Sequence, residues 1–284
     1  MGSNSATAFR IIKVKSTDNG DNAVDFVKIE DLLAVEVPLE IRILSGSENN
    51  RQEKNISVTM CTPGNDIELA TGFLFTEGII THHEDIINCF THGDNIVVVE
   101  LHPGISFDPQ KLERHFYTSS SCGVCGKSSI DSVKTIIKNK PTHDIIKIIA
   151  PVIIKLPEAL RKQQDIFKHT GGLHASALFD LNGRLLLTRE DVGRHNALDK
   201  LIGATLASGE IPLDHHILLL SGRASFELIQ KAAMAGIKIV CAVGAPSSLA
   251  VEMAKECEMT LIGFLRDGRF NIYAGEQRIS KTLM

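Results

Sequence analysis

The sequence predicts a protein of the α/β class, α+β overall, whose C-terminal half forms a layered α/β domain. From residue 217 onward, short apolar strand patterns alternate with helical patterns of about three turns. Glycine or proline marks the boundaries of these helices, and the N-terminal third holds apolar runs typical of strands. Alternating strands and helices favour parallel strands joined by right-handed crossovers, with helices covering the sheet. We therefore expect a smaller, β-rich N-terminal region before this domain.

The N-terminal region is expected to hold short strands and one helix. Pro63 to Asp66 supply turn and helix-start residues, with Asp66 as the N-cap, and apolar residues then recur at helical spacing until Gly78. The other expected elements are a strand over 35–44 around Pro38, a long polar loop over 45–55, and strands over 56–60 and 96–101.

In the C-terminal half, turn and helix-boundary residues are easier to recognise. Asn182-Gly183 is a strong hairpin signal, Gly236 is placed to end one helix, and Pro246-Ser247 to begin another. The expected elements are a helix over 157–167 with Pro157 in its first turn, strands over 175–179 and 185–188, a helix over 196–207, a strand over 217–220, a helix over 225–235, a strand over 237–243, a helix over 247–257 and a strand over 260–265.

Composition and charge describe a globular chain of 284 residues. Hydrophobic residues make up 43% and the net charge is −4, so the chain has no global basic field for binding nucleic acid. The best membrane candidate, 145–156, is too short and is broken by Lys147 and Lys155, and the N-terminus lacks a secretory signal. Six cysteines are too few for a disulfide framework, so we expect a cytoplasmic protein with reduced thiols.

The middle of the chain carries the motif Cys-Gly-Val-Cys at 122–125. Serines before it and glycines beside both cysteines favour a flexible loop that leads into a helix from Ser128. We therefore divide the chain into a mixed β-rich region (9–115), a cysteine loop with its following helix (116–143) and the C-terminal α/β domain (144–284).

Four chemistries compete for this cysteine pair. A structural zinc site needs four ligands, and the chain has no second pair; a thioredoxin-like motif follows a buried strand, which 114–121 does not form. A phosphate-binding loop is rejected because Ser121 replaces its first glycine. We favour a mobile nucleophilic thiol that carries a group and whose pKa is lowered by Lys127 and a helix start, with the second cysteine helping to discharge a persulfide by exchange. Thiol–disulfide chemistry stays open as a secondary hypothesis, whereas the flanking glycines and serines argue against buried, inert cysteines.

Small and polar residues follow several strands of the C-terminal half. Glycine allows close approach of a ligand to the backbone, a helix N-terminus favours an anion, and arginine can bind a phosphate through two hydrogen bonds. We expect these strand ends to form one cleft for a phosphorylated ligand, although 170–174 also fits a plain helix C-terminus and Asp267-Gly268 a hairpin turn. The candidate residues are Gly171, Gly172 and His174; Asp191, Arg194 and His195; Ser221, Gly222 and Arg223, with 244–248 repeating their layout; and Phe264, Leu265, Arg266, Asp267, Gly268 and Arg269.

Together these motifs resemble the FdhD/NarQ family of formate dehydrogenase accessory sulfurtransferases. The resemblance spans most of the chain after about Ala34. The matching stretches are 60–64, 68–74 and 77–80, Ser-Ser-Cys-Gly-Val-Cys-Gly-Lys at 120–127, Phe-Lys-His-Thr-Gly-Gly-Leu-His-Ala at 167–175, Glu-Asp-Val-Gly-Arg-His-Asn-Ala-Leu-Asp-Lys at 190–200, Ser-Gly-Arg at 221–223, and 266–273.

The resemblance implies a sulfurtransferase, a sulfur carrier working between a cysteine desulfurase and the formate dehydrogenase apoenzyme. Its cargo would be the molybdenum cofactor, a bis-molybdopterin guanine dinucleotide bound as a substrate, and no permanent metal is expected. By resemblance Cys122 carries the persulfide and 264–269 bind the cofactor. We expect Arg223, Arg266 and Arg269 to hold its phosphates, while Asp191 and His195 shape the site.

The resemblance also implies a fold in which the C-terminal three-layer α/β/α domain is similar to cytidine deaminases. Deaminase chemistry is not expected, because His174-Ala175-Ser176 lacks the glutamate of the deaminase signature. We further expect a homodimer. A non-catalytic chaperone for the molybdenum cofactor and a dithiol oxidoreductase remain as alternatives to sulfur transfer.

Overall fold

The computed structural model describes residues 5–17, 24–105 and 146–281, so the cysteine loop and the helix expected after it lie outside the described residues. The N-terminal elements are β1 (Ala6–Ser16), β2 (Val24–Ala34), β3 (Val37–Ser47), β4 (Asn50–Cys61), α1 (Asp66–Thr76), β5 (Ile86–Thr91) and β6 (Ile96–Leu101). The C-terminal elements are β7 (Ile148–Ile149), α4 (Ala150–Gln163), α5 (Asp165–Thr170), β8 (His174–Phe179), β9 (Leu185–Asp191), α6 (Arg194–Ala207), β10 (Ile217–Leu220), α7 (Phe226–Met234), β11 (Ile239–Ala242), α8 (Ser248–Glu256), β12 (Thr260–Arg266), β13 (Arg269–Ala274) and β14 (Ile279–Ser280).

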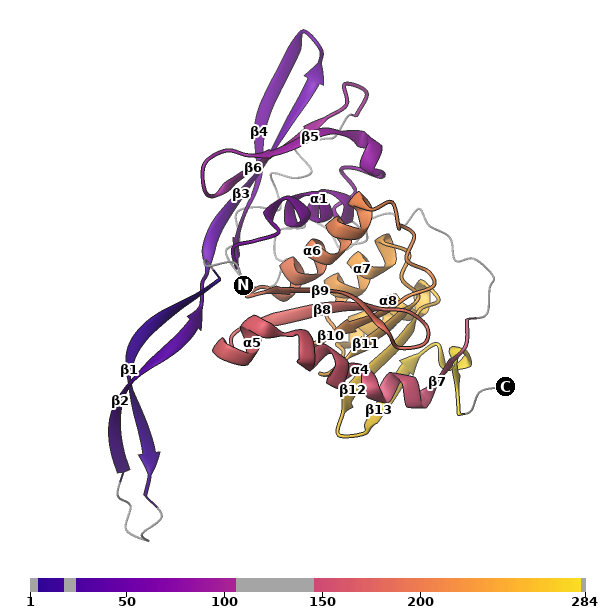
Figure 1. Ribbon diagram of the computed structural model, residues 1–284. Coiled ribbons are helices and arrows are strands. Elements are labelled where there is room, and N and C mark those ends of the chain that lie inside the picture. The colour runs from indigo at the N-terminus through magenta and orange to yellow at the C-terminus, as the bar shows by residue number, and fades with distance from the viewer. Residues whose placement is uncertain (1–4, 18–23, 106–145, 282–284) are drawn as a thin grey trace.

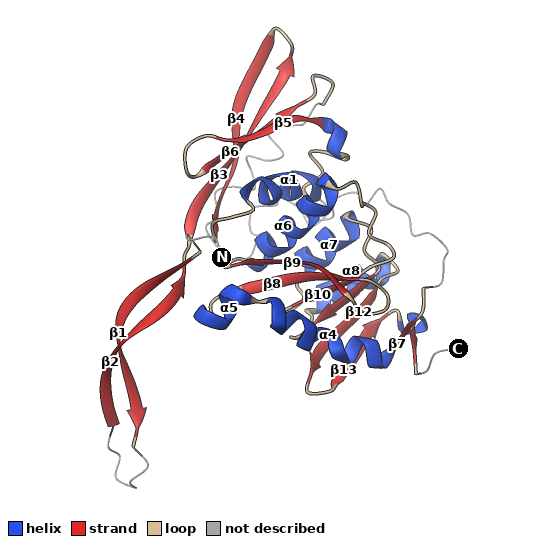
Figure 2. Ribbon diagram, in the orientation of Figure 1, coloured by secondary structure: helices blue, strands red, loops and turns tan. Residues whose placement is uncertain are grey.

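The body of the molecule is a stack of layers (Figures 1 and 2). A four-stranded sheet, in the order β4-β3-β6-β5, lies next to α1. A six-stranded sheet, in the order β13-β12-β11-β10-β8-β9, is covered on one face by α6, α7 and α8 and on the other by α4. Strands β10, β11 and β12 are parallel, whereas β8 and β13 run antiparallel to their neighbours. The C-terminal half therefore has the expected α/β/α layers around a sheet that is mixed.

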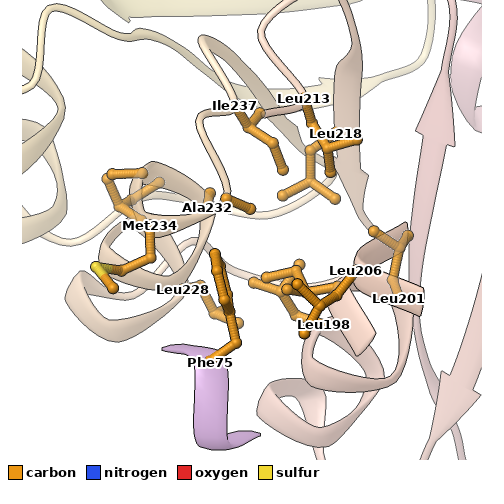
Figure 3. Close-up of a cluster of buried hydrophobic side chains, with 14 of the residues drawn as sticks. Phe75, Leu198, Leu201, Leu206, Leu213, Leu218, Leu228, Ala232, Met234 and Ile237 are labelled. Atoms are coloured by element: carbon orange, nitrogen blue, oxygen red, sulfur yellow. The ribbon is translucent and has the colours of Figure 1, made fainter. Parts of the chain in front are cut away.

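One hydrophobic core joins the two sheets. Ile41 and Ile43 of β3 belong to the same buried cluster as α1, the inner sides of α6 and α7, and Leu218 of β10. Figure 3 shows part of this core, in which Phe75 of α1 lies among side chains of the C-terminal half: Leu198, Leu201, Leu206, Leu213, Leu218, Leu228, Ala232, Met234 and Ile237. A second core lies between α4 and the opposite face of the six-stranded sheet. The N-terminal region and the C-terminal half thus fold as one packed body.

Helices α1 and α6 cross with their backbones in contact. A Cβ atom added to Gly72 of α1 would lie 1.9 Å from the carbonyl oxygen of Asp199 in α6. A Cβ atom added to Gly203 of α6 would likewise lie 1.9 Å from the carbonyl oxygen of Glu68 in α1. Since no side chain fits at such distances, only glycine at both positions permits this crossing.

A buried ion pair lies beside this crossing and connects three helices. Lys231 Nζ of α7 lies 2.9 Å from Asp199 Oδ2 of α6 and donates to Thr76 Oγ1 of α1 at 2.8 Å. Burial lowers the pKa of Lys231, but the carboxylates of Asp199 and Glu77 outweigh it and hold that pKa above its ordinary value. The ammonium group is therefore charged, and its contacts with Asp199 and Thr76 hold the three helices together.

The first two strands form a ribbon that projects away from the body (Figure 1). Each strand is 11 residues long, and the register runs from Ala6 opposite Ala34 to Ser16 opposite Val24. Within the described residues the two strands pair with no third strand. The sequence analysis did not predict these strands, because their apolar residues fall on both faces and give no clean alternation.

Three sequence expectations are wrong in detail. The loop expected over 45–55 is the tip of a long hairpin, because β3 and β4 pair as far as Ser47 opposite Asn50. Asp66 is the first residue of α1 and not its N-cap; Asn65 takes that place in a left-handed conformation, and the Asp66 carboxylate accepts from the Gly64 N–H at 3.1 Å.

The helix expected over 157–167 is also misplaced. It begins at Ala150, with Pro151 in its first turn and Pro157 inside it, and a separate short helix, α5, follows. Pro157 deprives the Ile153 carbonyl of a helical hydrogen bond, but burial of Ile153, Leu156 and Leu160 favours continuing the helix. None of the helices in the described part of the chain combines the length and apolar character needed to span a bilayer.

Candidate functional site

The predicted strand-end residues meet at one edge of the six-stranded sheet. Because β8 runs antiparallel to β10, the start of β8 lies beside the end of β10. The Ala175 N–H donates to Ser221 Oγ at 2.8 Å, and the Ser221 N–H donates to the Ala175 carbonyl at 2.9 Å. His174 pairs with Asp191 at the end of β9. Segments that are distant in sequence therefore converge here, as the sequence predicted.

The loops after β10 and β11 and the end of β12 are connected by backbone hydrogen bonds. The Gly244 N–H donates to the Gly222 carbonyl at 2.9 Å, and the Phe264 N–H donates to the Gly244 carbonyl at 3.0 Å. A Cβ atom on Gly222 would lie 3.2 Å from His174 Nδ1, and one on Gly244 would lie 3.0 Å from Arg223 Cγ. The glycines thus leave a partly exposed stretch of backbone between His174 and the arginine.

Histidine and arginine side chains border this backbone surface. His174 is half-buried, and burial first, then the nearby charges of Arg194 and His195, lowers its pKa below the ordinary value. The imidazole is therefore neutral at pH 7 and can both donate and accept a hydrogen bond. Arg194 is partly buried, and its Nε is a buried nitrogen that has no hydrogen-bond partner among the residues the structure describes. Arg223 is exposed.

His195 is held by residues that the sequence analysis did not select. Its Nε2 lies 2.8 Å from Glu227 Oε2 and 3.4 Å from Ser225 Oγ, both at the start of α7. The pair joins the N-terminus of α6 to that of α7 and fixes the orientation of the imidazole. An acidic residue in the first turn of a helix that follows Ser221-Gly222-Arg223 was the available signal for Glu227.

Asp191, one of the candidate residues, is buried behind the sheet edge. Its side chain is 0% exposed and forms an ion pair of 2.7 Å with Lys200 Nζ. Its carboxylate also accepts from the N–H groups of Thr62 (3.0 Å) and Gly193 (2.8 Å) and from the Asn196 amide (3.1 Å). With every lone pair engaged, Asp191 connects the end of β4 to the turn between β9 and α6.

The hairpin between β12 and β13 carries the remaining candidates. Asp267 and Gly268 have φ values of 55° and 71°, the left-handed pair of a tight hairpin turn, so the expected turn is present. Arg266 and Arg269 face each other on its exposed side, and the Arg266 guanidinium lies 5.9 Å from the Phe264 ring centroid.

Two neighbouring residues of this hairpin differ in their environment. Leu265 is 1% exposed and belongs to the second core, so its side chain is not available to a ligand. Phe264 has φ of 52°, which is rare for a bulky residue and costs strain. That unusual backbone breaks the pairing of β12 with β13 between Gly263 and Arg266, at the sheet edge where the other candidates converge.

The cysteine residues stand apart from this picture. Cys122 and Cys125 lie outside the described residues, so their position relative to the sheet edge is a prediction. Among the described cysteines, burial raises the pKa of Cys61 to about 12, and Cys241 is likewise buried with a raised pKa. These thiols are inert near neutral pH. No group of metal-binding side chains is assembled within the described ranges.

Comparison with known proteins now identifies the family. The model of the FdhD/NarQ family matches residues 34–280. The chain belongs to the FdhD/NarQ family. A relative from Streptomyces coelicolor, named sulfur carrier protein FdhD, is 46% identical over 261 residues, covering 88% of this chain and 89% of its own. Relatives of the same name from Mycobacterium tuberculosis (43% identical, 97% of this chain and 99% of theirs) and Thermoplasma volcanium (44% identical, 89% and 91%) show equally broad matches.

A solved structure supports the fold of this family member. The crystal structure described as a formate dehydrogenase accessory protein from Desulfotalea psychrophila superposes with a TM-score of 0.72. The match covers 97% of this chain and 100% of that chain at 22% sequence identity. At that identity the likeness concerns the fold, and the FdhD/NarQ assignment rests on the family model and the closer relatives.

Proposed function

We propose that this protein is a sulfurtransferase that carries sulfur for the maturation of formate dehydrogenase. A cysteine desulfurase would supply persulfide sulfur, and the molybdenum cofactor, a bis-molybdopterin guanine dinucleotide, would receive it before insertion into the apoenzyme. The observation that carries the proposal is the sheet edge at which Gly222, Gly244 and Phe264 are joined by backbone hydrogen bonds beside His174 and Arg223. The names of the relatives agree with the carrier role.

The sheet edge has the properties that a guanine dinucleotide requires. The partly exposed backbone at Gly222, which has no side chain, would allow a diphosphate to approach closely, and the guanidinium of exposed Arg223 can neutralise it through paired hydrogen bonds. Arg266 and Arg269 on the neighbouring hairpin extend the positive surface for further phosphates. Neutral His174 adds a hydrogen bond without contributing charge.

The sulfur chemistry is assigned to the cysteine pair by resemblance. The Cys122 thiolate attacks the outer sulfur of the desulfurase persulfide, forming a new S–S bond and releasing the desulfurase thiolate. When Cys125 then attacks the Cys122 sulfur, hydrosulfide leaves and a Cys122–Cys125 disulfide forms, which a cellular dithiol must reduce before the next cycle. That hydrosulfide would then replace an oxygen ligand of the molybdenum in the bound cofactor, and the oxygen would leave as water after taking up the hydrosulfide proton and one proton from solvent.

Intact-mass analysis tests the carrier role directly. After incubation with a cysteine desulfurase and cysteine, the wild type should gain one sulfur atom that is lost on reduction. Cys122→Ala should gain none; if it gains the same mass, the assignment of the carrier is wrong.

Nucleotide binding tests the sheet edge independently of sulfur. Titration with guanosine diphosphate should show binding that Arg223→Ala weakens about tenfold, since a charge-assisted hydrogen bond is worth roughly 1.5–3 kcal/mol. Arg184→Ala, in the exposed turn between β8 and β9, is the matched control and should bind as the wild type does. Equal affinity for all three proteins would exclude this edge as the nucleotide site.

A second candidate function is a non-catalytic chaperone that only delivers the molybdenum cofactor. It is favoured by the fact that none of the residues placed at the sheet edge in the described part of the chain is a cysteine. Formate dehydrogenase activity restored in cells by Cys122→Ser with Cys125→Ser would select it. A dithiol oxidoreductase, the third candidate, requires equal loss of activity when either cysteine is replaced.

Two further proposals concern assembly and place. We propose a homodimer, because an exposed strand edge is available for pairing at the ribbon. We also propose a cytoplasmic location, where cysteine thiols stay reduced; fractionation of cells should recover the protein with soluble cytoplasmic enzymes. Recovery with membranes would contradict that location.

A further inference from the structure

The pair formed by His195 and Glu227 takes part in none of the steps proposed above, although it lies at the sheet edge. Both side chains are partly exposed, that of His195 by 22% and that of Glu227 by 15%. His195 Nε2 lies 3.4 Å from Ser225 Oγ, and Ser225 follows Arg223 by two residues, so the imidazole lies against the loop between β10 and α7. His195 is also near enough to His174 to act on its pKa, after burial and Arg194. The pair therefore belongs to the surface proposed to bind a nucleotide.

The contact with Glu227 decides which nitrogen of His195 is available to a ligand. A carboxylate can only accept hydrogen bonds, so Nε2, which lies 2.8 Å from Glu227 Oε2, carries a hydrogen. The two nitrogens of an imidazole point in different directions, so Nδ1 faces away from Glu227. Within the described residues no group forms a hydrogen bond with Nδ1. Nδ1 is thus the available polar atom of a ring whose orientation is fixed.

Helix α7 also restrains Glu227. Lys231 follows Glu227 by four residues, which places both side chains on one side of α7. Burial lowers the pKa of Lys231, but nearby carboxylates, Glu227 among them, outweigh burial and raise it. The Lys231 ammonium and the Glu227 carboxylate therefore attract each other along the helix. This attraction restrains the carboxylate that contacts His195, and it links that contact to the buried ion pair between α6 and α7.

We propose that Glu227 is a positioning residue for nucleotide binding, which holds His195 so that its Nδ1 forms a hydrogen bond with the bound guanine nucleotide. The inference rests on the proposed function, because it needs a nucleotide at the sheet edge. A neutral imidazole accepts at Nδ1 from a hydroxyl or N–H group of the nucleotide, and a protonated one donates from Nδ1 to a phosphate oxygen. In both states the Nε2–H group stays on Glu227, which acts only through His195.

Two substitutions of His195 distinguish its two nitrogens. The amide of an asparagine side chain places polar atoms near the position of Nδ1, whereas the amide of glutamine reaches the position of Nε2. Titration of the full-length protein with guanosine diphosphate should show that His195→Gln weakens binding about tenfold, through loss of one hydrogen bond to the ligand. His195→Asn should bind within about threefold of the wild type. The same two substitutions at His215, an exposed histidine before β10, are matched controls and should leave binding unchanged.

Replacement of Glu227 tests the positioning role. Glu227→Ala removes the acceptor of the Nε2–H group and should weaken binding of guanosine diphosphate about fivefold, because the imidazole is then free to rotate. In a His195→Asn background, which has no Nε2 to hold, Glu227→Ala should have no further effect on binding. Glu252→Ala, at an exposed acidic residue of α8, is the matched control and should bind as the wild type does.

Nitrogen-15 nuclear magnetic resonance of the histidine side chains gives a readout that a merely structural contact would not change. The signals of His195 are identified by their loss in His195→Asn. In the neutral imidazole of the wild type they should show the hydrogen on Nε2, and addition of guanosine diphosphate should shift the Nδ1 signal. In Glu227→Ala the hydrogen should be distributed over both nitrogens.

Each contrary outcome removes the inference. Equal affinities of His195→Gln and His195→Asn, or a Glu227→Ala effect of the same size in both backgrounds, would overturn it. If Arg223→Ala weakens binding while every variant of His195 and Glu227 binds as the wild type does, the proposed site stands and only this inference fails. A wild type that binds no guanosine diphosphate would overturn both, while sulfur loading would still be measurable. The urea unfolding midpoint of each variant separates misfolding from loss of a ligand contact.

Discussion

The two long hairpins of the N-terminal region have the same architecture and opposite environments. Strands β1 and β2 have 11 residues each, and β3 and β4 have 11 and 12, so both hairpins are of similar length. In β3, Leu39, Ile41 and Ile43 are buried against α1, and they alternate with polar residues on the other face. In the ribbon no large side chain is buried, although its strands are richer in apolar residues than β3 and β4.

The comparison shows that strand pairing alone does not create a core. A hairpin with one apolar face can be covered by another part of its own chain, as α1 covers β3. The other face of this hairpin carries charged side chains, such as Arg42 and Glu53, which form an ion pair of 2.8 Å. A ribbon with apolar residues on both faces cannot be covered by a single layer of its own chain. Among the described residues, the ribbon therefore gains less stability from burial than β3–β4 does.

The largest effect should come from releasing the end of the β3–β4 hairpin, where Asp191 contacts Thr62. Lys200→Met leaves the fully buried Asp191 carboxylate without its partner and should lower the free energy of unfolding by about 4 kcal/mol. Urea denaturation measures this loss. Lys162→Met removes a solvent-exposed ion pair with Glu158 and should leave the denaturation midpoint nearly unchanged. Similar losses in both variants would contradict a special role for the buried pair.

A somewhat smaller effect is expected inside the β3–β4 hairpin itself. Ile43→Ala leaves a cavity at a fully buried position between β3 and α1 and should cost about 3 kcal/mol in the free energy of unfolding. The same urea titration reports it. A loss below 1 kcal/mol would mean that the core between the two sheets is loosely packed, and the contrast with the ribbon would weaken.

The third prediction concerns the sheet edge next to the ribbon base. Burial lowers the pKa of His174 in the folded protein below its ordinary value of 6.5, so the unfolded chain takes up a proton more readily. The stability that His174 contributes is present above pH 6.5 and is lost as pH falls through the folded-state pKa. His174→Gln should flatten this decline in the unfolding midpoint between pH 7.5 and 5, whereas exposed His215→Gln should not.

The smallest effect is expected in the ribbon. Val14→Ala should change the free energy of unfolding, measured by urea denaturation, by less than about 0.5 kcal/mol, because Val14 is 51% exposed. A large destabilisation would show that this side of the ribbon is covered by other residues.

The C-terminal elements were predictable because local signals mark their ends. The helices near Gly236 and Ser247 and the strand at 217–220 lie within two residues of expectation, since caps and turns act over a few residues. The strand-end loops were predictable for the same reason. Pro157 led to a wrong start for the helix that is α4, because a proline in the first turn and a proline inside a helix look alike in sequence. Only the buried face of α4 distinguishes the two cases.

The rest depended on contacts between distant segments. The residues around Asp191 in the sequence do not indicate that Thr62 and Lys200 contact its carboxylate. They also do not indicate that Glu227 pairs with His195. Leu265 was selected with its neighbours as a candidate ligand-binding residue. The backbone conformation at Phe264 instead directs the Leu265 side chain into the second core. The ribbon was missed because the periodicity that indicates a strand presumes one protected face, which the ribbon does not have within its own copy.

The glycine crossing of α1 and α6 constrains how this protein can change. At Gly72 and Gly203 the two main chains touch, so even a methyl group on one helix would force the other to move. Segments carrying these helices therefore cannot be exchanged freely between relatives: a chimera joined near residue 101 should fold only when both parents keep glycine at both places. Inheritance of the two halves is coupled at this crossing, which makes it the first position to inspect when recombining members of the family.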